Sequence, residues 1–346
     1  MAIKSHTVPK RLLRQFSYYE ASTRSLRLWR YERGRAPYPK ASPETATRIE
    51  GHFADPNDAL LEATVEKQLA YEIEDPVNQF ISNFDDASFV MSELQRRQMT
   101  RYVTLLFNRS MARREATRHL MGIRNHALNQ FLSNKDQLAT VAAQWNLDAH
   151  FRGLNFGRLI TLEDVANVAR GYVVSDPSAP EVQEWYAQGT ARAIAGFDDR
   201  LFRGQWKMVS TLPESPYILS DAPVIAWKRM ASGTINHGVG FHTPDVEVFL
   251  PVSPIKCLHI LPFVERTRDV ETPLLREINM AQAAFASSAC FANQKSAEID
   301  VIVQQYISTV KLGQNAFTVF HRNYDNTVYD MLMNHGRWVE PPRRTI

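Results

Sequence analysis

A histidine near the start of the chain lies among cations that would tune its chemistry. The basic residues nearest to His6 in the sequence are Lys4, Lys10, Arg11 and Arg14. Nearby positive charge disfavours the protonated imidazole, so this ring would stay neutral and able to act as a base or as a ligand. The alternative is a structural role, in which the ring bonds the backbone of its own turn before Pro9. The sequence leaves both interpretations open.

A second candidate is a carboxylate inside an apolar run. Asp221 interrupts the strand-like sequence ILSDAPVIAW. Burial of an unpaired carboxylate costs several kcal/mol, so Asp221 must find an arginine, a cation or several N–H donors. The structural alternative is an Asx turn at the end of a strand, with Pro223 enforcing the bend.

Familiar catalytic signatures are absent from the sequence. It contains no Walker A loop, GxGxxG, GxSxG, HExxH or CxxC motif, which excludes the common nucleotide-binding and zinc-hydrolase patterns. Arg114 and His119 stand five residues apart in a predicted helix, the spacing of one helical RNase superfamily. Chance produces this spacing readily in so arginine-rich a chain, and a solvated or salt-bridged helix face is the alternative.

The predicted secondary structure that would position these residues is mainly helical in the first two thirds of the chain and includes a sheet after that. Apolar periodicity predicts helices at 58–81, 88–146 (two or three), 162–170, 180–195 and 272–294. Pro76 is expected to kink or end the first of these. Short β-branched and aromatic runs predict a sheet, and residues 299–310 fit either a helix or a strand. The expected fold is α+β: a mostly helical first two thirds packed on a small mixed or antiparallel sheet formed mainly by residues 203–265, with a strand at 25–32 as a candidate addition.

Composition places the chain among ordinary globular proteins. With 346 residues, 44% of them hydrophobic and 22% charged, it is neither fibrous nor wholly disordered. We expect a single large domain over 1–346 with two sub-regions, a mainly helical part at about 1–197 that includes an early strand, and a sheet with helices at about 198–346.

Compartment and membrane association are predicted from cysteine usage and hydropathy. Cys257 and Cys290 could form at most one bridge, so the expected location is the reducing cytoplasm. No run of 18 apolar residues occurs, and the first 16 residues are too charged for a signal peptide. We therefore expect no membrane association. The oligomeric state is not predicted.

Charge is divided into blocks behind a net charge of only +3. Residues 1–40 are strongly basic, residues 41–93 are strongly acidic, and residues 94–126 are basic again. In one interpretation the acidic segment folds against both basic ones. In the other, one basic face stays open for phosphate groups, for which the planar guanidinium of arginine is a good bidentate partner.

Three short blocks resemble a known family. They are HTVPKRLLRQF (6–16), ILSDAPV (218–224) and FLPVSP (249–254). In this order they resemble the landmarks of a mainly microbial family catalogued as domain of unknown function 4238, and the likeness runs from residue 4 to about 290. The chain differs from the usual pattern at Ala222, where Asn is more frequent, and at Val252, where Leu is common. The resemblance implies no particular reaction, cofactor or substrate.

The resemblance adds candidate residues to His6 and Asp221, because Glu, Arg and Asn residues of the family fall at matching positions. The candidate catalytic residues are then His6, Asp221, Glu66 and Glu74, and the candidate substrate-binding residues are Arg14, Arg109 and Asn279. One or two such residues would be explained by a structural role. Seven are harder to explain in that way, because buried charge usually stabilises a fold less than apolar packing does. We expect them to converge on one solvent-accessible site.

The leading hypothesis is an enzyme, specifically a nuclease or other hydrolase, that acts on a phosphate-bearing substrate such as a nucleic acid. Arg14 and Arg109 would bind phosphate oxygens, and His6 would serve as general base or acid. Asp221, with one of the two glutamates, would orient the histidine or hold a divalent cation. The alternative is a non-catalytic binding or interaction protein in which these charges form a structural network. A toxin or effector of microbial conflict is a third reading, which concerns context rather than chemistry.

Overall fold

The computed structural model describes residues 4–50, 61–86, 88–151, 153, 157–173, 199–237, 239–241, 243–262 and 275–310. The chain divides into two compact units. Unit 1 comprises Met1–Ala116 and Gln183–Leu312, and unit 2 comprises Thr117–Val182 and Gly313–Ile346. The predicted helix at 180–195 and the expected helix start at Asp58 lie outside the described residues.

Unit 1 contains a five-stranded antiparallel sheet with the order β6-β11-β10-β8-β9. Its strands are β6 (Gln205–Ser210), β8 (Ile225–Arg229), β9 (Ile235–His237), β10 (Val246–Ser253) and β11 (Lys256–Leu261). All eight residues of β10 are buried, as expected of an apolar central strand. The predicted sheet at 203–265 and the α+β class are therefore confirmed.

A second sheet of unit 1 joins the beginning of the chain to its latter part. Its strands are β2 (Tyr18–Glu20), β3 (Ser25–Tyr31), β12 (Cys290–Ala292) and β7 (Leu219–Ser220) in this order, with β4 (Tyr38–Ala41) paired to β3. The early strand thus does not extend the sheet of β6, β11, β10, β8 and β9, but lies in the same sheet as β7. It pairs with β12, a buried strand hidden in sequence by the good helix formers that precede it. A separate pair joins β1 (Lys4–His6) to β5 (Arg48–Glu50).

The helices follow the predicted order with three refinements. Those of unit 1 are α1 (Lys10–Gln15), α2 (Leu61–Leu69), the π-helical turn η1 (Ala70–Glu74), α3 (Asp75–Asn78), the 3₁₀ turn η2 (Ile81–Asp85), α4 (Glu93–Asn108), α9 (Asp199–Arg203), α10 (Leu275–Phe285) and α11 (Ala297–Tyr306). Pro76 has no N–H to donate, and the helix before it is interrupted by η1. The expected helix at 272–294 ends at Phe285, and the ambiguous segment is helical as α11.

Helix α5 (Met111–Ser133) begins in unit 1 and continues into unit 2, where α6 (Lys135–Phe151) and α7 (Leu162–Arg170) follow. A capping box of Thr161 and Asp164 begins α7, and Gly171 ends it as predicted. Apolar residues of α5, α6 and α7, among them Leu128 and Trp145, form a small core within unit 2.

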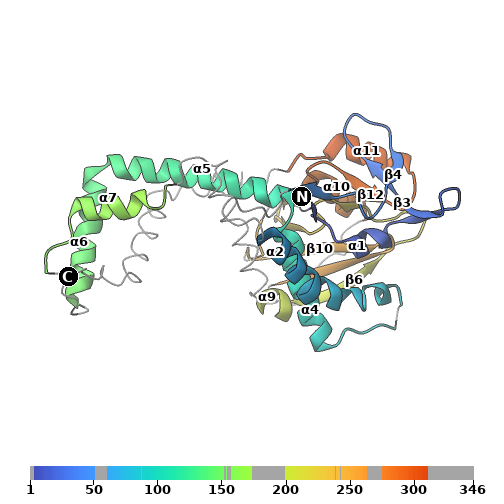
Figure 1. The fold of residues 1–346 in the computed structure, drawn as a ribbon, viewed down its shortest axis with the longest axis horizontal. Helices are drawn as coiled ribbons and strands as arrows, with labels where there is room; N and C mark the ends of the chain where they lie inside the picture. The colour runs from blue at the N-terminus through green and yellow to red at the C-terminus, as the bar shows by residue number, and fades with distance from the viewer. Residues whose placement is uncertain are drawn as a thin grey trace. The chain divides into compact units, whose positions relative to one another are not determined.

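The larger core of unit 1 lies between the sheets and their helices. Helix α1 packs against β10, and α10 packs against β7, β8 and α11 (Figure 1). Cys257 and Cys290 are free thiols in this buried environment, and burial raises the pKa of both. Within the described part of the chain, no helix is both long enough and apolar enough to cross a lipid bilayer.

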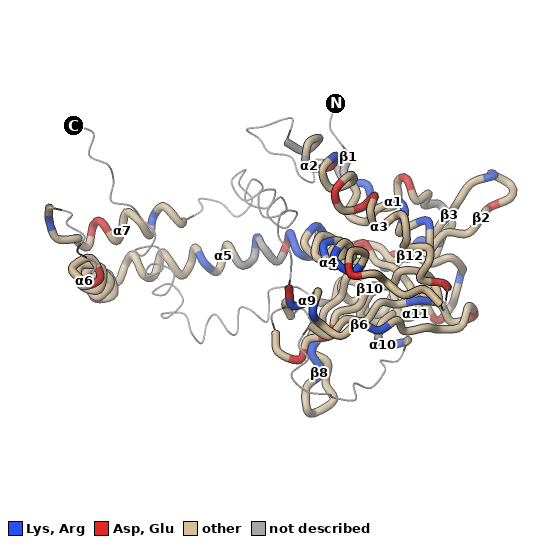
Figure 2. The backbone as a smooth tube through the Cα atoms, turned by 90° about the horizontal axis from the view of Figure 1, so that it is seen from below, with Lys and Arg blue, Asp and Glu red and all other residues tan. Residues whose placement is uncertain are grey.

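The acidic segment pairs with both basic segments, as the first interpretation of the charge blocks predicts. Among the described residues, five ion pairs make this connection, at Arg14–Glu44, Arg97–Glu93, Arg101–Glu72, Arg109–Glu66 and Arg109–Glu74. Figure 2 marks the two kinds of charge along this part of unit 1. Much of the opposite charge in the blocks is thus compensated between neighbouring segments.

Candidate functional site

A cavity of about 380 Å³ in unit 1 brings together residues far apart in the sequence. We call it the Asp221 cavity, because that carboxylate forms part of its wall. Ligand pockets typically measure about 300–1,000 Å³, so the volume suits a small molecule. Its wall carries two arginines, Arg30 and Arg48, and the first residue of α5, Met111. Five residues with hydroxyl groups also line it: Thr7, Thr45, Thr47, Ser287 and Ser288.

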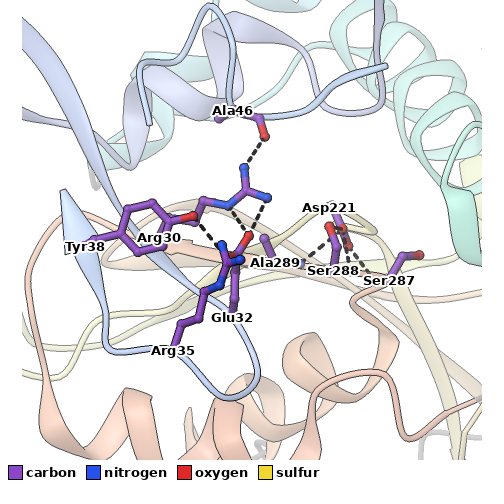
Figure 3. A network of polar contacts seen from close by, with 9 residues as sticks. All are labelled: Arg30, Glu32, Arg35, Tyr38, Ala46, Asp221, Ser287, Ser288 and Ala289. Atoms are coloured by element: carbon purple, nitrogen blue, oxygen red, sulfur yellow. Dashed lines mark hydrogen bonds and ion pairs between the residues drawn. The ribbon is translucent and has the colours of Figure 1, made fainter. Parts of the chain in front are cut away.

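Asp221 receives its hydrogen bonds from the turn that follows α10 (Figure 3). The backbone N–H of Ser287 donates to Oδ1 at 2.7 Å. Oδ2 accepts from the N–H of Ser288 at 2.8 Å, from its hydroxyl at 2.7 Å and from the N–H of Ala289 at 3.2 Å. Several N–H donors, rather than an Asx turn, therefore satisfy this carboxylate. Burial raises the pKa of Asp221, and these four donors oppose the rise.

Two amides on α10 hold the segment that carries Asp221. Asn279 Oδ1 accepts from the N–H of Ile218 at 3.0 Å, and its Nδ2 donates to the carbonyl of Pro216 at 2.9 Å. One turn later, Gln282 Oε1 accepts from the N–H and the hydroxyl of Ser220, at 3.0 and 2.8 Å. The two side chains share one helix face because they are three residues apart. Both are buried.

His6 and Arg14 meet at one residue, Glu44. His6 Nε2 lies 3.0 Å from the carbonyl oxygen of Glu44, and Arg14 Nη2 lies 3.0 Å from its Oε1. A carbonyl only accepts, so the neutral ring carries its proton on Nε2 and presents Nδ1 as the basic atom. Glu44 leads directly into Thr45 and Ala46, which line the cavity. Neither His6 nor Arg14 is a lining residue.

Burial lowers the pKa of His6, and the cations Lys10, Arg109 and Arg48 lower it further. The hydrogen bond to the Glu44 carbonyl opposes this change without reversing it. The sequence predicted that nearby cations would lower this pKa, and they contribute to the change. The cause is more burial than charge, and two of the three cations come from distant segments.

Arg109 ends α4 and is almost completely enclosed. Its side chain is 1% exposed, with Nη1 2.6 Å from Glu74 Oε1 and Nη2 3.6 Å from Glu66 Oε1. The carboxylates come from η1 and α2, so three helical segments meet at this ionic cluster. Met111 follows two residues later at the cavity wall. The cluster therefore fixes the junction from which α5 begins beside the cavity.

The side chain of Arg30, on β3, forms part of the cavity wall (Figure 3). Its Nε donates to Glu32 Oε1 at 2.7 Å and its Nη1 to the carbonyl of Ala46 at 3.1 Å. The guanidinium also lies 5.8 Å from the centre of the Phe291 ring. Arg48, by contrast, is exposed at the same cavity.

Two hydroxyls of the cavity wall have no hydrogen-bond partner among the described residues, although both oxygens are buried. They are Thr7 Oγ1 and Ser287 Oγ. Their neighbours on the same wall are satisfied: Thr47 Oγ1 bonds the backbone N–H and carbonyl of Val8, and Ser288 Oγ bonds Asp221. Unsatisfied buried hydroxyls are uncommon in folded proteins, so each of these two needs an explanation.

The seven predicted residues, all of them described, thus fall into two groups. Asp221 lines the cavity. The other six hold the segments that form its wall or carry Asp221, through contacts at Glu44, at Arg109 and on α10.

Sequence reasoning missed the lining arginines, the two unpartnered hydroxyls, Glu44 and Gln282. The basic strand predicted at 25–32 was the one available signal for Arg30, and it indicated only a strand.

The described residues add no support for a metal site or for a catalytic role of the helical Arg–His spacing. Among them, no group of three or more His, Cys, Asp or Glu side chains is arranged to hold a metal ion. Glu66 and Glu74, the proposed partners of Asp221 for a divalent cation, face the guanidinium of Arg109 instead. Arg114 and His119 both lie on α5, and the side chain of His119 is outside the described part.

Fold and cavity define an α+β protein with two antiparallel sheets and a polar cavity walled by residues from both ends of unit 1. The sequence model of the family described as "Protein of unknown function (DUF4238)" matches residues 4–296, and the chain belongs to this family. All seven predicted residues lie within the matched range. Comparison with the curated proteins and with the solved structures gave no match.

Proposed function

We propose that this protein is an enzyme that acts on a phosphate-bearing substrate held in the Asp221 cavity. One observation carries the proposal: a buried carboxylate, two arginines and two hydroxyls that have no partner among the described residues line the same ligand-sized cavity. Convergence of such groups in one hollow is typical of a binding or catalytic site.

Phosphate binding is supported by three positive features of the wall. Arg48 is an exposed guanidinium, and Arg30 is held in place by its bond to Ala46. Helix α5 begins at Met111, and the N-terminal end of a 23-residue helix attracts anions. Glu115, four residues after Met111 on α5, and the Arg30 partner Glu32 reduce the positive charge. The phosphate would therefore bind on the Arg48 side.

In this proposal Asp221 acts as the general acid or base. Burial raises the pKa of its carboxyl, which favours proton exchange at the cavity wall. His6 is a second candidate base through Nδ1, reached by movement of the Glu44 segment. Arg14, Arg109, Glu66, Glu74 and Asn279 act as positioning residues, because their contacts hold the wall.

Hydrolysis of RNA or DNA is the specific activity to test first. Purified full-length chain is incubated with labelled RNA or DNA and with Mg²⁺, Mn²⁺ or EDTA. We expect Asp221→Asn to lower the rate by about 100-fold, the usual contribution of a general acid or base. Arg48→Gln is expected to raise KM, and the control Arg203→Gln, an exposed arginine that does not line the cavity, to change neither. Absence of cleavage under every condition would contradict a nuclease, and equal effects of the two arginine variants would contradict this site.

The non-catalytic alternative also has a specific observation in its favour. Asp221 already accepts four hydrogen bonds from the protein, and Arg109 is closed within ion pairs. If the network is only architectural, His6→Ala and Asp221→Ala each lose several kcal/mol of unfolding free energy, and no substrate binds. If His6 and Asp221 were instead retained for activity, each substitution should lower stability only slightly or raise it.

A further inference from the structure

The hydroxyl of Thr7 lacks, within the described structure, hydrogen bonds of the kind that its neighbour Thr47 makes. Thr7 is 1% exposed and Thr47 is 6% exposed, and both line the Asp221 cavity. Thr47 Oγ1 makes two backbone hydrogen bonds, whereas Thr7 Oγ1 has no partner within the described structure. A buried hydroxyl without a partner is destabilising by about 1–3 kcal/mol. A ligand in the cavity would supply the missing partner.

The same contrast recurs on the opposite segment of the wall. Ser288 directs its hydroxyl to Asp221 Oδ2, whereas Ser287 Oγ is buried and has no partner in the part of the chain described. The backbone N–H of Ser287 donates to Asp221 Oδ1, so this residue lies beside the carboxylate. Within the described chain, Oδ1 accepts one hydrogen bond and Oδ2 accepts three.

The chemistry of this wall distinguishes between ligand groups. A fully ionised phosphate monoester has no proton to donate to a carboxylate and is repelled by its charge. An alcohol group can donate to Asp221 Oδ1 and at the same time accept from the hydroxyl of Ser287, and a second alcohol group can bond the hydroxyl of Thr7. The wall near Asp221 therefore suits alcohol groups, and the wall near Arg48 suits phosphate. A cavity of about 380 Å³ has room for one small ligand carrying both.

We infer that the ligand of the Asp221 cavity is a phosphorylated sugar, with its hydroxyl groups bound by Thr7, Ser287 and Asp221 and its phosphate bound by Arg48 and Arg30. This inference rests on the proposed function, because it names the substrate class of the same site. The sugar phosphate is either a free monosaccharide phosphate or part of a nucleotide.

Calorimetric titration of the full chain tests the inference. The probes are inorganic phosphate, ribose 5-phosphate and adenosine 5′-monophosphate, each at the same ionic strength. We expect ribose 5-phosphate to bind at least about 10-fold more tightly than inorganic phosphate, since it adds hydrogen bonds to two hydroxyls and a carboxylate. Tighter binding of the nucleotide than of ribose 5-phosphate assigns the sugar to a nucleotide, and equal or weaker binding assigns it to a free sugar phosphate; both support the inference.

Matched variants then locate the contact. Thr7→Val and Ser287→Ala should each weaken the binding of ribose 5-phosphate by about 5- to 10-fold and leave the binding of inorganic phosphate unchanged. Thr47→Val, which removes a hydroxyl that the backbone already satisfies, should keep the preference for the sugar phosphate. Melting curves verify folding, because Thr7→Val removes no hydrogen bond seen in the described structure and should not lower Tm.

The outcomes separate this inference from the proposal on which it rests. Equal binding of inorganic phosphate and ribose 5-phosphate, or equal loss of both in Thr7→Val, would overturn the sugar assignment while phosphate binding stands. If none of the three probes binds, the proposed function itself fails.

Discussion

The Arg109 cluster and the Asp221 cavity are both built from polar residues of distant segments, yet they differ in how those residues are satisfied. Arg109 is 1% exposed and faces two carboxylates. The cavity wall instead leaves two buried hydroxyls without partners among the described residues and presents an exposed arginine. Charge enclosed by its own counter-charges stabilises an arrangement of helices. Hydroxyls without a described partner point to a ligand where, as here, they line a cavity.

Breaking the Arg109 cluster should have the largest effect. Arg109→Met leaves Glu66 and Glu74 without their buried cation, so we expect a loss of about 3–5 kcal/mol in unfolding free energy. The control is Arg101→Met, which removes a 3.5 Å ion pair to Glu72 between partly exposed side chains and should cost less than about 1 kcal/mol. Urea denaturation measures both. Equal losses would mean that the cluster is not a special anchor.

Removing the Asn279 amide that holds the Asp221 segment should have the next largest effect on stability. Asn279→Leu leaves the N–H of Ile218 and the carbonyl of Pro216 without their partner, at an expected cost of about 2–3 kcal/mol. Gln294→Leu is the comparison, because its amide makes only long, 3.4 Å contacts near the surface. Chemical denaturation of the two variants gives the difference, and a stable Asn279→Leu protein would show that another contact fixes this segment.

A smaller effect separates the two serines of the Asp221 turn. Ser288→Ala removes a 2.7 Å bond to the carboxylate and should lower stability by about 1–2 kcal/mol. Ser287→Ala removes an oxygen with no described partner and should leave Tm nearly unchanged. The contrast between satisfied and unsatisfied hydroxyls predicts this order. Thermal unfolding that ranks the two serines equally would argue against it.

The smallest effect is a pH dependence from His6. Its pKa lies below the usual 6.5 in the folded chain, because burial disfavours the charged ring. Between the folded pKa and 6.5 the unfolded chain binds more protons, so unfolding free energy should fall as pH drops through this window. His6→Gln should weaken the fall, while His237, whose pKa burial also lowers, leaves part of it in place. Denaturation curves at pH 7.5, 6.5 and 5.5 test this, and identical slopes for both proteins would refute the assignment.

Strong local patterns made much of the fold predictable. The apolar runs at 203–265 gave the sheet, and the stripe before Gly171 gave α7 with its end. The second sheet was not predictable, because β12 is three residues long and follows the good helix formers of α10. Its pairing with β3 depends on contacts more than 250 residues apart, which no local pattern records.

The residues that support the cavity wall were easier to predict from the sequence than the residues that line the cavity. Charged residues such as His6 and Arg109 stand out in a sequence because of their type. The hydroxyl of Thr7 resembles every other threonine until the fold leaves it buried and without a described partner. Asp221 was recognisable because it interrupts an apolar run, and it is the one predicted residue that lines the cavity.

A crystal structure of the full chain soaked in tungstate, a heavy analogue of phosphate, would show whether the Asp221 cavity binds phosphate. We expect an anomalous density peak in the Asp221 cavity, within hydrogen-bond distance of the Arg48 guanidinium, that disappears in Arg48→Gln. Tungstate bound elsewhere in crystals whose Asp221 cavity stays empty and open to solvent would contradict this expectation.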